Sequence, residues 1–253
     1  MKRISESFAR ARSAGRGAFV AYLTMGYPSL DKSEAAADAL VAGGVDVLEL
    51  GVPFSDPFAD GGVIRSAAYE ALRQGVGLAD VIALAGRLRA KHPDTGIVLF
   101  SYYNPVFSMG LGRFADAAAA AGVDAVLVVD LPLEEREELL AELRPRGIGY
   151  VPLIAPNTPL DRVAESAKGV GDSFLYVITV KGTTGARTAL PSDLSARLDA
   201  IRGVSSLPVA VGFGVSTKAQ ADAISQHADG YIVGSALVKR LGDEGALAGE
   251  LLP

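Results

Sequence analysis

The sequence predicts a single-domain (β/α)₈ barrel over residues 1–253, an α/β fold with an extra N-terminal helix. Eight short runs are continuously apolar, and each is followed by helical periodicity. Continuously apolar strands are typical of parallel strands that are buried on both faces. Right-handed crossovers between eight such units favour a closed barrel, with a doubly wound open sheet as the alternative. A chain of 253 residues with 49% hydrophobic content is long enough for one large core.

Each expected strand is an apolar run that ends at polar, proline or glycine residues. In chain order, the strands are expected at 18–24, 45–50, 97–100, 124–129, 148–154, 174–178, 208–211 and 230–233. An amphipathic helix around Ile4, Phe8 and Ala11 comes before them and is expected to act as a flap. The other helices are expected at 31–42, 62–74, 78–91, 113–121, 134–143, 160–167, 192–201, 217–225 and 235–241.

The amino-acid composition argues against several classes of partner. The formal net charge is −5 and the pI is near 5.1, which argues against nucleic acid as a main partner and against electrostatic membrane binding. There are no cysteines, and His92 and His227 fall at expected helix ends, so they are interpreted as solvated residues and no metal site is expected. The N-terminus lacks the apolar core of a signal peptide and no run is long enough to span a bilayer, so the cytoplasm is the expected compartment.

The segment LELGVPFSDPFADG, residues 48–61, is the centre of the predicted site. Glu49 lies inside an apolar run, where burial disfavours the charged carboxylate unless it has a partner or a function. The proline-containing loop that follows can bring Asp60 back over the barrel mouth, so that two acids address one substrate. Structural alternatives are an Arg or hydroxyl partner for Glu49, a helix N-cap at Asp60 and an Asx-turn at Asp56.

Glycine-rich segments follow the sixth, seventh and eighth expected strands. They are 182–185, 212–216 and 234–236. Glycines let backbone N–H groups approach an anion closely, and a short helix that begins at Gly234-Ser235 would point its N-terminus at that anion. The sequence therefore predicts a phosphate site built from backbone amides, which needs no basic patch.

The motifs LELGVPFSDPFADG, SYYNPVF, VVDLP, GFGVS and VGSALVK together resemble the alpha subunit of tryptophan synthase. The resemblance implies a (β/α)₈ barrel that cleaves indole-3-glycerol phosphate into indole and glyceraldehyde 3-phosphate. It also implies a pyridoxal-phosphate beta subunit as partner, in an α₂β₂ assembly. By resemblance, Glu49 is the acid/base and Asp60 the partner of the indole N–H. The substrate-binding residues it implies are Tyr22, Phe100, Tyr176, Thr184, Gly185, Phe213, Gly214, Gly234 and Ser235.

The chemistry of that cleavage agrees with the two carboxyl groups. C3 of the indole must be protonated, and a proton must then leave the adjacent hydroxyl so that an aldehyde departs. One carboxyl group can do both, which requires a raised pKa for Glu49, while an ionised Asp60 stabilises the charge on the ring nitrogen. The indole ring is its own electron sink, so no cofactor is expected.

A rim of strand-end residues is the predicted docking surface for the partner. It comprises Pro53, Asp56, Pro57, Asn104, Pro105, Asp130 and Pro132, with the apolar rings Phe54, Phe58 and Phe107 expected near loop tips. The sequence departs from the family's usual pattern at Gly62, Val63, Arg65, Val180, Lys181 and Thr183. Three alternatives therefore stay open: a stand-alone lyase that supplies free indole, a different phosphate-barrel enzyme, and a non-catalytic phosphate-binding barrel.

Overall fold

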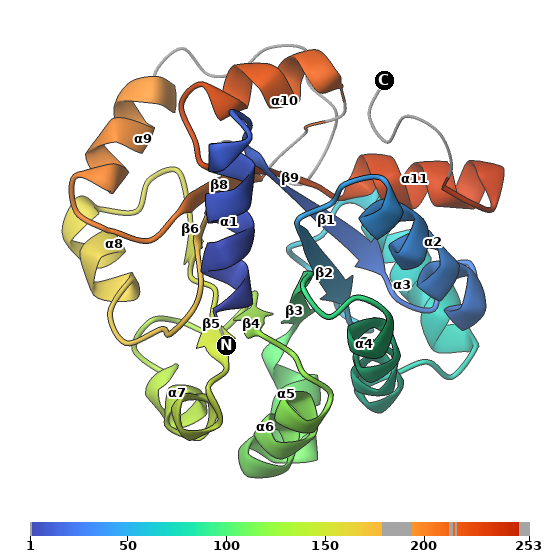
Figure 1. The fold of residues 1–253 in the computed structure, drawn as a ribbon. Helices are drawn as coiled ribbons and strands as arrows, with labels where there is room; N and C mark the ends of the chain where they lie inside the picture. Colours follow the sequence, from blue (N-terminus) through green and yellow to red (C-terminus); the bar gives the residue numbers. More distant parts are fainter. Residues whose placement is uncertain (1, 179–193, 213–214, 216, 248–253) are drawn as a thin grey trace.

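The computed structural model describes residues 2–178, 194–212, 215 and 217–247 (Figure 1). Its strands form one parallel sheet in the order β5-β4-β3-β2-β1-β9-β8-β7-β6. The strands are β1 Ala18–Thr24, β2 Val47–Gly51, β3 Gly96–Ser101, β4 Ala125–Val128, β5 Gly149–Tyr150, β6 Leu153–Ile154, β7 Leu175–Ile178, β8 Val209–Gly212 and β9 Gly230–Val233.

The two ends of this sheet, β5 and β6, are joined by two residues, and this junction closes the barrel. The sequence predicted one strand over 148–154, but Pro152 has no backbone N–H and the strand is divided there. Val151 N–H still donates to the Val126 carbonyl at 2.8 Å, and Tyr176 N–H donates to the Pro152 carbonyl at 3.0 Å. The first half of the predicted strand thus pairs with β4 and the second half with β7. The expected (β/α)₈ barrel is confirmed.

Helices surround the sheet (Figure 1). They are α1 Arg3–Ser13, α2 Leu30–Ala42, α3 Gly62–Arg73, α4 Leu78–Lys91, α5 Tyr103–Met109, α6 Leu111–Ala120, α7 Glu137–Leu143, the 3₁₀ turn η1 Arg144–Arg146, α8 Leu160–Ser166, α9 Leu194–Arg202, α10 Lys218–Ser225 and α11 Ser235–Glu244. Helix α5 was not predicted, because residues 101–105 were assigned to the end of the third expected strand. Pro105 lies in the first turn of α5, where a missing N–H costs no helical hydrogen bond.

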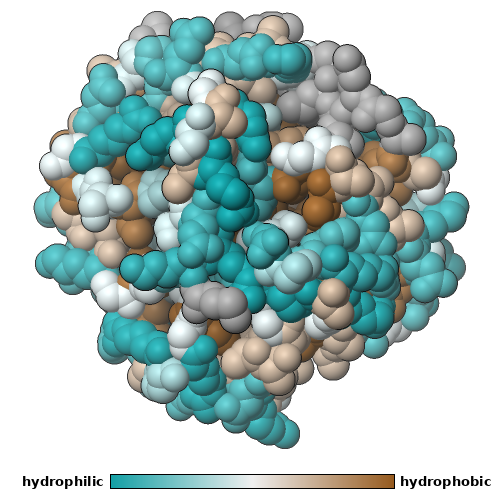
Figure 2. All heavy atoms as spheres, viewed as in Figure 1, coloured by the Kyte–Doolittle hydropathy of each residue, from teal (hydrophilic) through white to brown (hydrophobic). Residues whose placement is uncertain are grey.

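Helix α1 lies across the mouth at the amino-terminal ends of the strands, with a hydrophilic outward surface (Figures 1 and 2). Ile4, Phe8 and Ala11 are buried in the barrel interior, where the Phe8 and Phe174 ring centroids are 5.3 Å apart. The helix therefore closes one end of the barrel as a plug, and the interpretation as a flap is wrong. The periodicity of its apolar residues was read correctly, but it gives no information on which surface they pack against.

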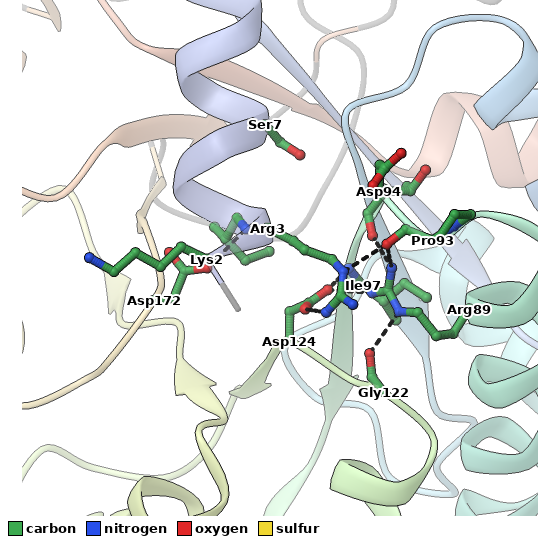
Figure 3. Close-up of polar contacts among 12 residues, drawn as sticks. Lys2, Arg3, Ser7, Arg89, Pro93, Asp94, Ile97, Gly122, Asp124 and Asp172 are labelled. Atoms are coloured by element: carbon green, nitrogen blue, oxygen red, sulfur yellow. Dashed lines mark hydrogen bonds and ion pairs between the residues drawn. The ribbon is translucent and has the colours of Figure 1, made fainter.

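Two arginines and one aspartate fasten this plug (Figure 3). Arg3 of α1 and Arg89 of α4 both donate to Asp124, at 2.9 and 2.5 Å. Asp124, which immediately precedes β4, is 6% exposed and also accepts the Ile97 N–H at 2.9 Å. Asp172 accepts the Ile4 and Ser5 N–H groups at the start of α1. These contacts position the plug by charge as well as by apolar packing.

We expect Asp124→Ala to lower the free energy of unfolding by about 3 kcal/mol, because it leaves two largely buried guanidinium groups without their shared carboxylate. Urea titration followed by circular dichroism measures the loss. The matched control is Asp116→Ala, which removes an exposed aspartate from its ion pair with Arg146 and should leave stability near that of the parent. Equal losses in the two variants would contradict a structural role for the Asp124 cluster.

The two histidines precede β3 and β9, at the amino-terminal ends of the strands and away from the end of the barrel that carries Asp60. His92 Nε2 is 2.8 Å from Asp38 Oδ1, and His227 is exposed after α10. Within the described residues, no group of three or more His, Cys, Asp or Glu side chains is placed to hold a metal ion. Of the helices in that part of the chain, none has the length and apolar character needed to cross a membrane.

Candidate active site

Glu49 projects into the barrel from the middle of β2. Val47, two residues earlier, belongs to the interior apolar cluster, whereas Leu48 and Leu50 pack against the surrounding helices. Side chains alternate along a strand, so Glu49 shares the interior face with Val47. In the strand register Glu49 is level with Tyr22 of β1 and Val98 of β3. Only 1% of Glu49 is exposed.

The Glu49 carboxyl group has no hydrogen-bond partner for either oxygen among the described residues. Burial alone raises its pKa from the ordinary value of 4.5 to about 8. The structural alternative, a carboxylate paired with an Arg or hydroxyl, is therefore not what the described residues show. At neutral pH this environment favours a protonated carboxyl group that can act as an acid.

Asp60 ends the loop between β2 and α3. Backbone hydrogen bonds between residues close in sequence hold the loop. In one of them the Asp60 N–H donates to the Pro57 carbonyl at 3.0 Å. Gly61, not Asp60, is the N-cap of α3, so the capping interpretation is wrong. Burial raises the pKa of Asp60 to about 6, although the Tyr102 hydroxyl and the positive charge of Arg65 act to lower it. Asp60 is thus more acidic than Glu49, and ionised at neutral pH.

Three predicted aromatic residues line one pocket with Asp60. Tyr22 and Phe100 meet edge to face with ring centroids 5.0 Å apart, and Tyr176 joins them from β7. The described lining also includes Ala59, Ile64, Val129, Leu153, Ile178, Val215, Ile232, Gly234 and Ser235. Burial is the main cause of the raised pKa of both Tyr22 and Tyr176, and the charges of Asp60 and Glu49 add to it. A flat apolar ring fits such a lining.

Two glycines make room for these tyrosine rings. A Cβ atom at Gly51 would lie 2.4 Å from the Tyr22 hydroxyl oxygen, and one at Gly212 would lie 2.3 Å from a Tyr176 ring carbon. Both contacts are shorter than real Cβ contacts allow, so any larger residue would displace the ring. Sequence reasoning assigned Gly212 to the phosphate segment, whereas here its absent side chain shapes the aromatic pocket.

The phosphate end of the predicted site is described in part. Gly234 and Ser235 line the pocket at the start of α11, a ten-residue helix whose first backbone N–H groups are free of helical partners. Four other predicted substrate residues lie outside the described residues: Thr184, Gly185, Phe213 and Gly214. The departures at Val180, Lys181 and Thr183 lie outside them as well.

The predicted rim is only partly a surface. Asp56, Asn104 and Pro132 are exposed and Pro57 and Pro105 are half-buried, but Pro53 is buried. The rim aspartate Asp130 accepts the Tyr103 N–H at 2.7 Å, at the start of α5.

The three rim phenylalanines differ in exposure. Phe58 is 70% exposed and Phe107 61% exposed, as predicted. Phe54 is half-buried and stacks on Tyr102 with centroids 4.8 Å apart, so it is not a free loop-tip ring.

Tyr102 is a site residue that sequence reasoning missed. It lies within the quoted motif SYYNPVF, directly after β3, and its hydroxyl donates to Asp60 Oδ2 at 2.9 Å. The available signal was its place at a strand end on the same face as the two acids, but either tyrosine of the pair could have pointed inward. Only the packing of the 53–60 loop selects Tyr102.

Fold and site together define a class. A (β/α)₈ barrel with a buried acid that has no partner among the described residues, a second carboxyl group and a helix N-terminus at the carboxyl ends of its strands has the groups expected of an acid/base enzyme of phosphorylated substrates. The family model for the tryptophan synthase alpha chain matches residues 8–250. The chain belongs to the tryptophan synthase alpha chain family.

Individual relatives and a solved structure support this family membership. The alpha chain of Laribacter hongkongensis is 44% identical over 252 residues, covering 100% of this chain and 95% of the relative. The alpha chain of Halorhodospira halophila is 46% identical, with 98% and 90% covered. A tryptophan synthase structure from Mycobacterium tuberculosis superposes with a TM-score of 0.89 at 37% identity, covering 96% of this chain and 92% of that one. Membership makes the chain a carbon–carbon lyase of tryptophan biosynthesis that cleaves indole-3-glycerol phosphate.

Proposed function

We propose that Glu49 and Asp60 perform the cleavage of indole-3-glycerol phosphate, with Glu49 as acid and then base. The observation that carries this assignment is the Glu49 carboxyl group, which is buried and has no hydrogen-bond partner among the described residues. It is level in the strand register with Tyr22, which lines the aromatic pocket together with Asp60. Burying an acid without a partner costs free energy, so a barrel that only binds a ligand gains nothing from it.

The reaction follows from the two pKa values. Protonated Glu49 donates to C3 of the indole, and ionised Asp60 stabilises the positive charge that develops at the ring N–H. The Glu49 carboxylate then accepts the proton of the hydroxyl on the carbon attached to C3. The bond from that carbon to C3 breaks, its electron pair returns to the ring, and indole and glyceraldehyde 3-phosphate are released. Glu49 ends protonated, ready for the next cycle.

The remaining pocket residues bind and orient the substrate. Tyr22, Phe100 and Tyr176 enclose the indole ring, while Gly234 and Ser235 present the N-terminus of α11 to the phosphate. We assign Thr184, Gly185, Phe213 and Gly214 to the same phosphate-binding and closing segments. Because the phosphate is bound by backbone groups, the acidic net charge of the chain does not oppose its binding.

An assay of indole release from indole-3-glycerol phosphate tests this function. The purified chain should form indole and glyceraldehyde 3-phosphate in equal amounts. Substrate incubated without protein is the control for spontaneous breakdown. If the chain binds the substrate, as measured by calorimetry, but releases no indole, it is a phosphate-binding barrel without this activity.

We further propose that the rim docks a tryptophan synthase beta subunit in an α₂β₂ complex. Phe58 and Phe107 are large, strongly exposed apolar rings on the side of the barrel that holds the pocket, where they would be covered by a partner. A structural neighbour from Pyrococcus furiosus, described as an α₂β₂ tryptophan synthase complex, supports this assembly with a TM-score of 0.84 at 38% identity.

With a cognate beta subunit, sedimentation at micromolar concentrations should show the complex, and indole release should rise at least about tenfold, or about 1.4 kcal/mol. The Phe107→Ser variant removes an exposed ring that lies outside the 53–60 loop, and it should weaken association without changing the activity of the isolated chain. Full activity of the isolated chain and no association would instead establish a stand-alone lyase, for which the departures at Gly62, Val63 and Arg65 are the sequence argument.

A further inference from the structure

Tyr102 lies next to Asp60 but outside the pocket. It is 2% exposed and is absent from the described residues that line the substrate cavity. Its hydroxyl has two partners in the 53–60 loop: it donates to Asp60 Oδ2 at 2.9 Å and accepts the Ala59 N–H at 3.2 Å. One phenol oxygen thus fixes both the side chain of Asp60 and the backbone just before it.

The ring of Tyr102 is held as firmly as its hydroxyl. Phe54 stacks on it with centroids 4.8 Å apart, and Phe58 meets it edge to face at 5.6 Å. Both phenylalanines belong to the same loop as Asp60. The loop therefore closes around the tyrosine, so a displacement of the ring would displace the loop.

The backbone of Tyr102 is anchored on the barrel. The Ser101 hydroxyl donates to the Tyr102 carbonyl at 2.9 Å, and the next residue, Tyr103, donates its N–H to Asp130 at 2.7 Å. Tyr102 is the N-cap of α5, between β3 and the helix. It joins the loop that carries Asp60 to the rigid end of a barrel strand.

We propose that Tyr102 is a positioning residue: its hydroxyl holds the Asp60 carboxylate in the orientation that meets the substrate's ring N–H. The catalytic consequence rests on the function proposed above, whereas the effect on Asp60 itself does not. Because both hydrogen bonds of the Tyr102 hydroxyl go to the 53–60 loop, to Asp60 and to the Ala59 N–H, Tyr102 acts through Asp60 and not by contact with substrate. Burial raises the pKa of Asp60, and the two groups that act against it are the Tyr102 hydroxyl and the positive charge of Arg65.

The test is Tyr102→Phe, which keeps the ring between Phe54 and Phe58 and removes only the hydroxyl. We expect kcat for indole release to fall about tenfold or more with KM changed less than about threefold, since the substrate's own contacts remain. The control is Tyr103→Phe, one residue further along, whose ring packs on Phe107 and whose hydroxyl makes no hydrogen bond to Asp60 within the described part of the chain. It should retain the parent kcat.

A second measurement separates positioning from general damage. The Asp60 carboxyl group is titrated by ¹³C NMR in the ligand-free protein, and its signal is assigned with Asp60→Asn. The Tyr102 hydroxyl favours the ionised form of Asp60, so its removal should raise the pKa of Asp60 above about 6, and Tyr103→Phe should not.

The outcomes separate the two proposals. An unchanged Asp60 titration in Tyr102→Phe overturns the positioning role, even if activity falls, because the loss is then structural. An unchanged kcat overturns it as well, as does a rise in KM alone. If the parent chain releases no indole, the proposed function fails, and the Asp60 titration still decides whether Tyr102 holds that carboxylate.

Discussion

Glu49→Gln is expected to lower kcat for indole release by about 10²- to 10⁴-fold, or about 3–5 kcal/mol of barrier, with little change in KM. Glutamine fills the same space but neither donates an acidic proton to C3 nor accepts one from the hydroxyl. Steady-state kinetics at pH 7 measure the loss. Near-normal turnover in this variant would refute the assignment of Glu49.

The matched control is Asp46→Asn, which changes a buried acid just before the same strand. Asp46 is paired with Arg16 and accepts the Phe19 N–H, at the opposite end of the barrel from the pocket. We expect this control to lose stability while keeping kcat. A fall in kcat as large as that of Glu49→Gln would show that any buried acid on this strand matters equally.

Stability provides an independent check on the same variant. The pKa of Glu49 is raised to about 8 in the folded protein and is near 4.5 in the unfolded chain, so protonation of Glu49 favours folding at low pH. This contribution to the free energy of unfolding is lost as the pH rises from about 4.5 to about 8. Glutamine does not titrate, so the Glu49→Gln variant does not lose this stability as the pH rises. The variant should therefore gain stability relative to the parent as the pH of a urea titration is raised from 5 to 9.

Asp60→Asn is expected to lower kcat/KM by at least about 10²-fold, or about 2.7 kcal/mol, because a neutral amide does not stabilise the positive charge on the ring nitrogen. The parent enzyme needs ionised Asp60 and protonated Glu49, so its kcat/KM should be bell-shaped, with limbs near pH 6 and pH 8. The residual activity of Asp60→Asn should lack the acidic limb.

Asp161→Asn, an exposed aspartate in the first turn of α8, is the control for Asp60→Asn and should keep the parent profile. If the acidic limb persists in Asp60→Asn, it belongs to a group other than Asp60. In that case the part of the mechanism that stabilises the ring nitrogen would need a different carboxylate.

The barrel was predictable because its strands are short apolar runs with helical periodicity between them. Two features needed tertiary information. The apolar run at 148–154 does not reveal that Pro152 divides it between two neighbouring strands. The apolar face of α1 does not reveal that the helix closes the amino-terminal end of the barrel, because this packing depends on interior residues contributed by several strands.

The two carboxyl groups were predictable from the sequence. Burying an acid inside an apolar strand costs free energy, and an acid at the end of a proline-containing loop after a strand lies at the carboxyl-terminal end of the barrel. Their pKa values depend on partners that are distant in sequence. Asp60 is contacted by Tyr102, which follows β3, and by the charge of Arg65 from α3, whereas Glu49 has no partner among the described residues. Neither the partners of Asp60 nor the lack of a partner for Glu49 follows from the spacing of residues in the sequence.

The central claim is that Glu49 carries a proton at neutral pH. The most direct measurement is a ¹³C NMR titration of the glutamate side-chain carboxyl groups, with Glu49→Gln to assign the signal. The account predicts that the Glu49 signal titrates with a midpoint near 8, apart from glutamates that titrate near 4.5. A Glu49 signal that is already ionised at pH 7, with a midpoint near 4.5, would contradict it.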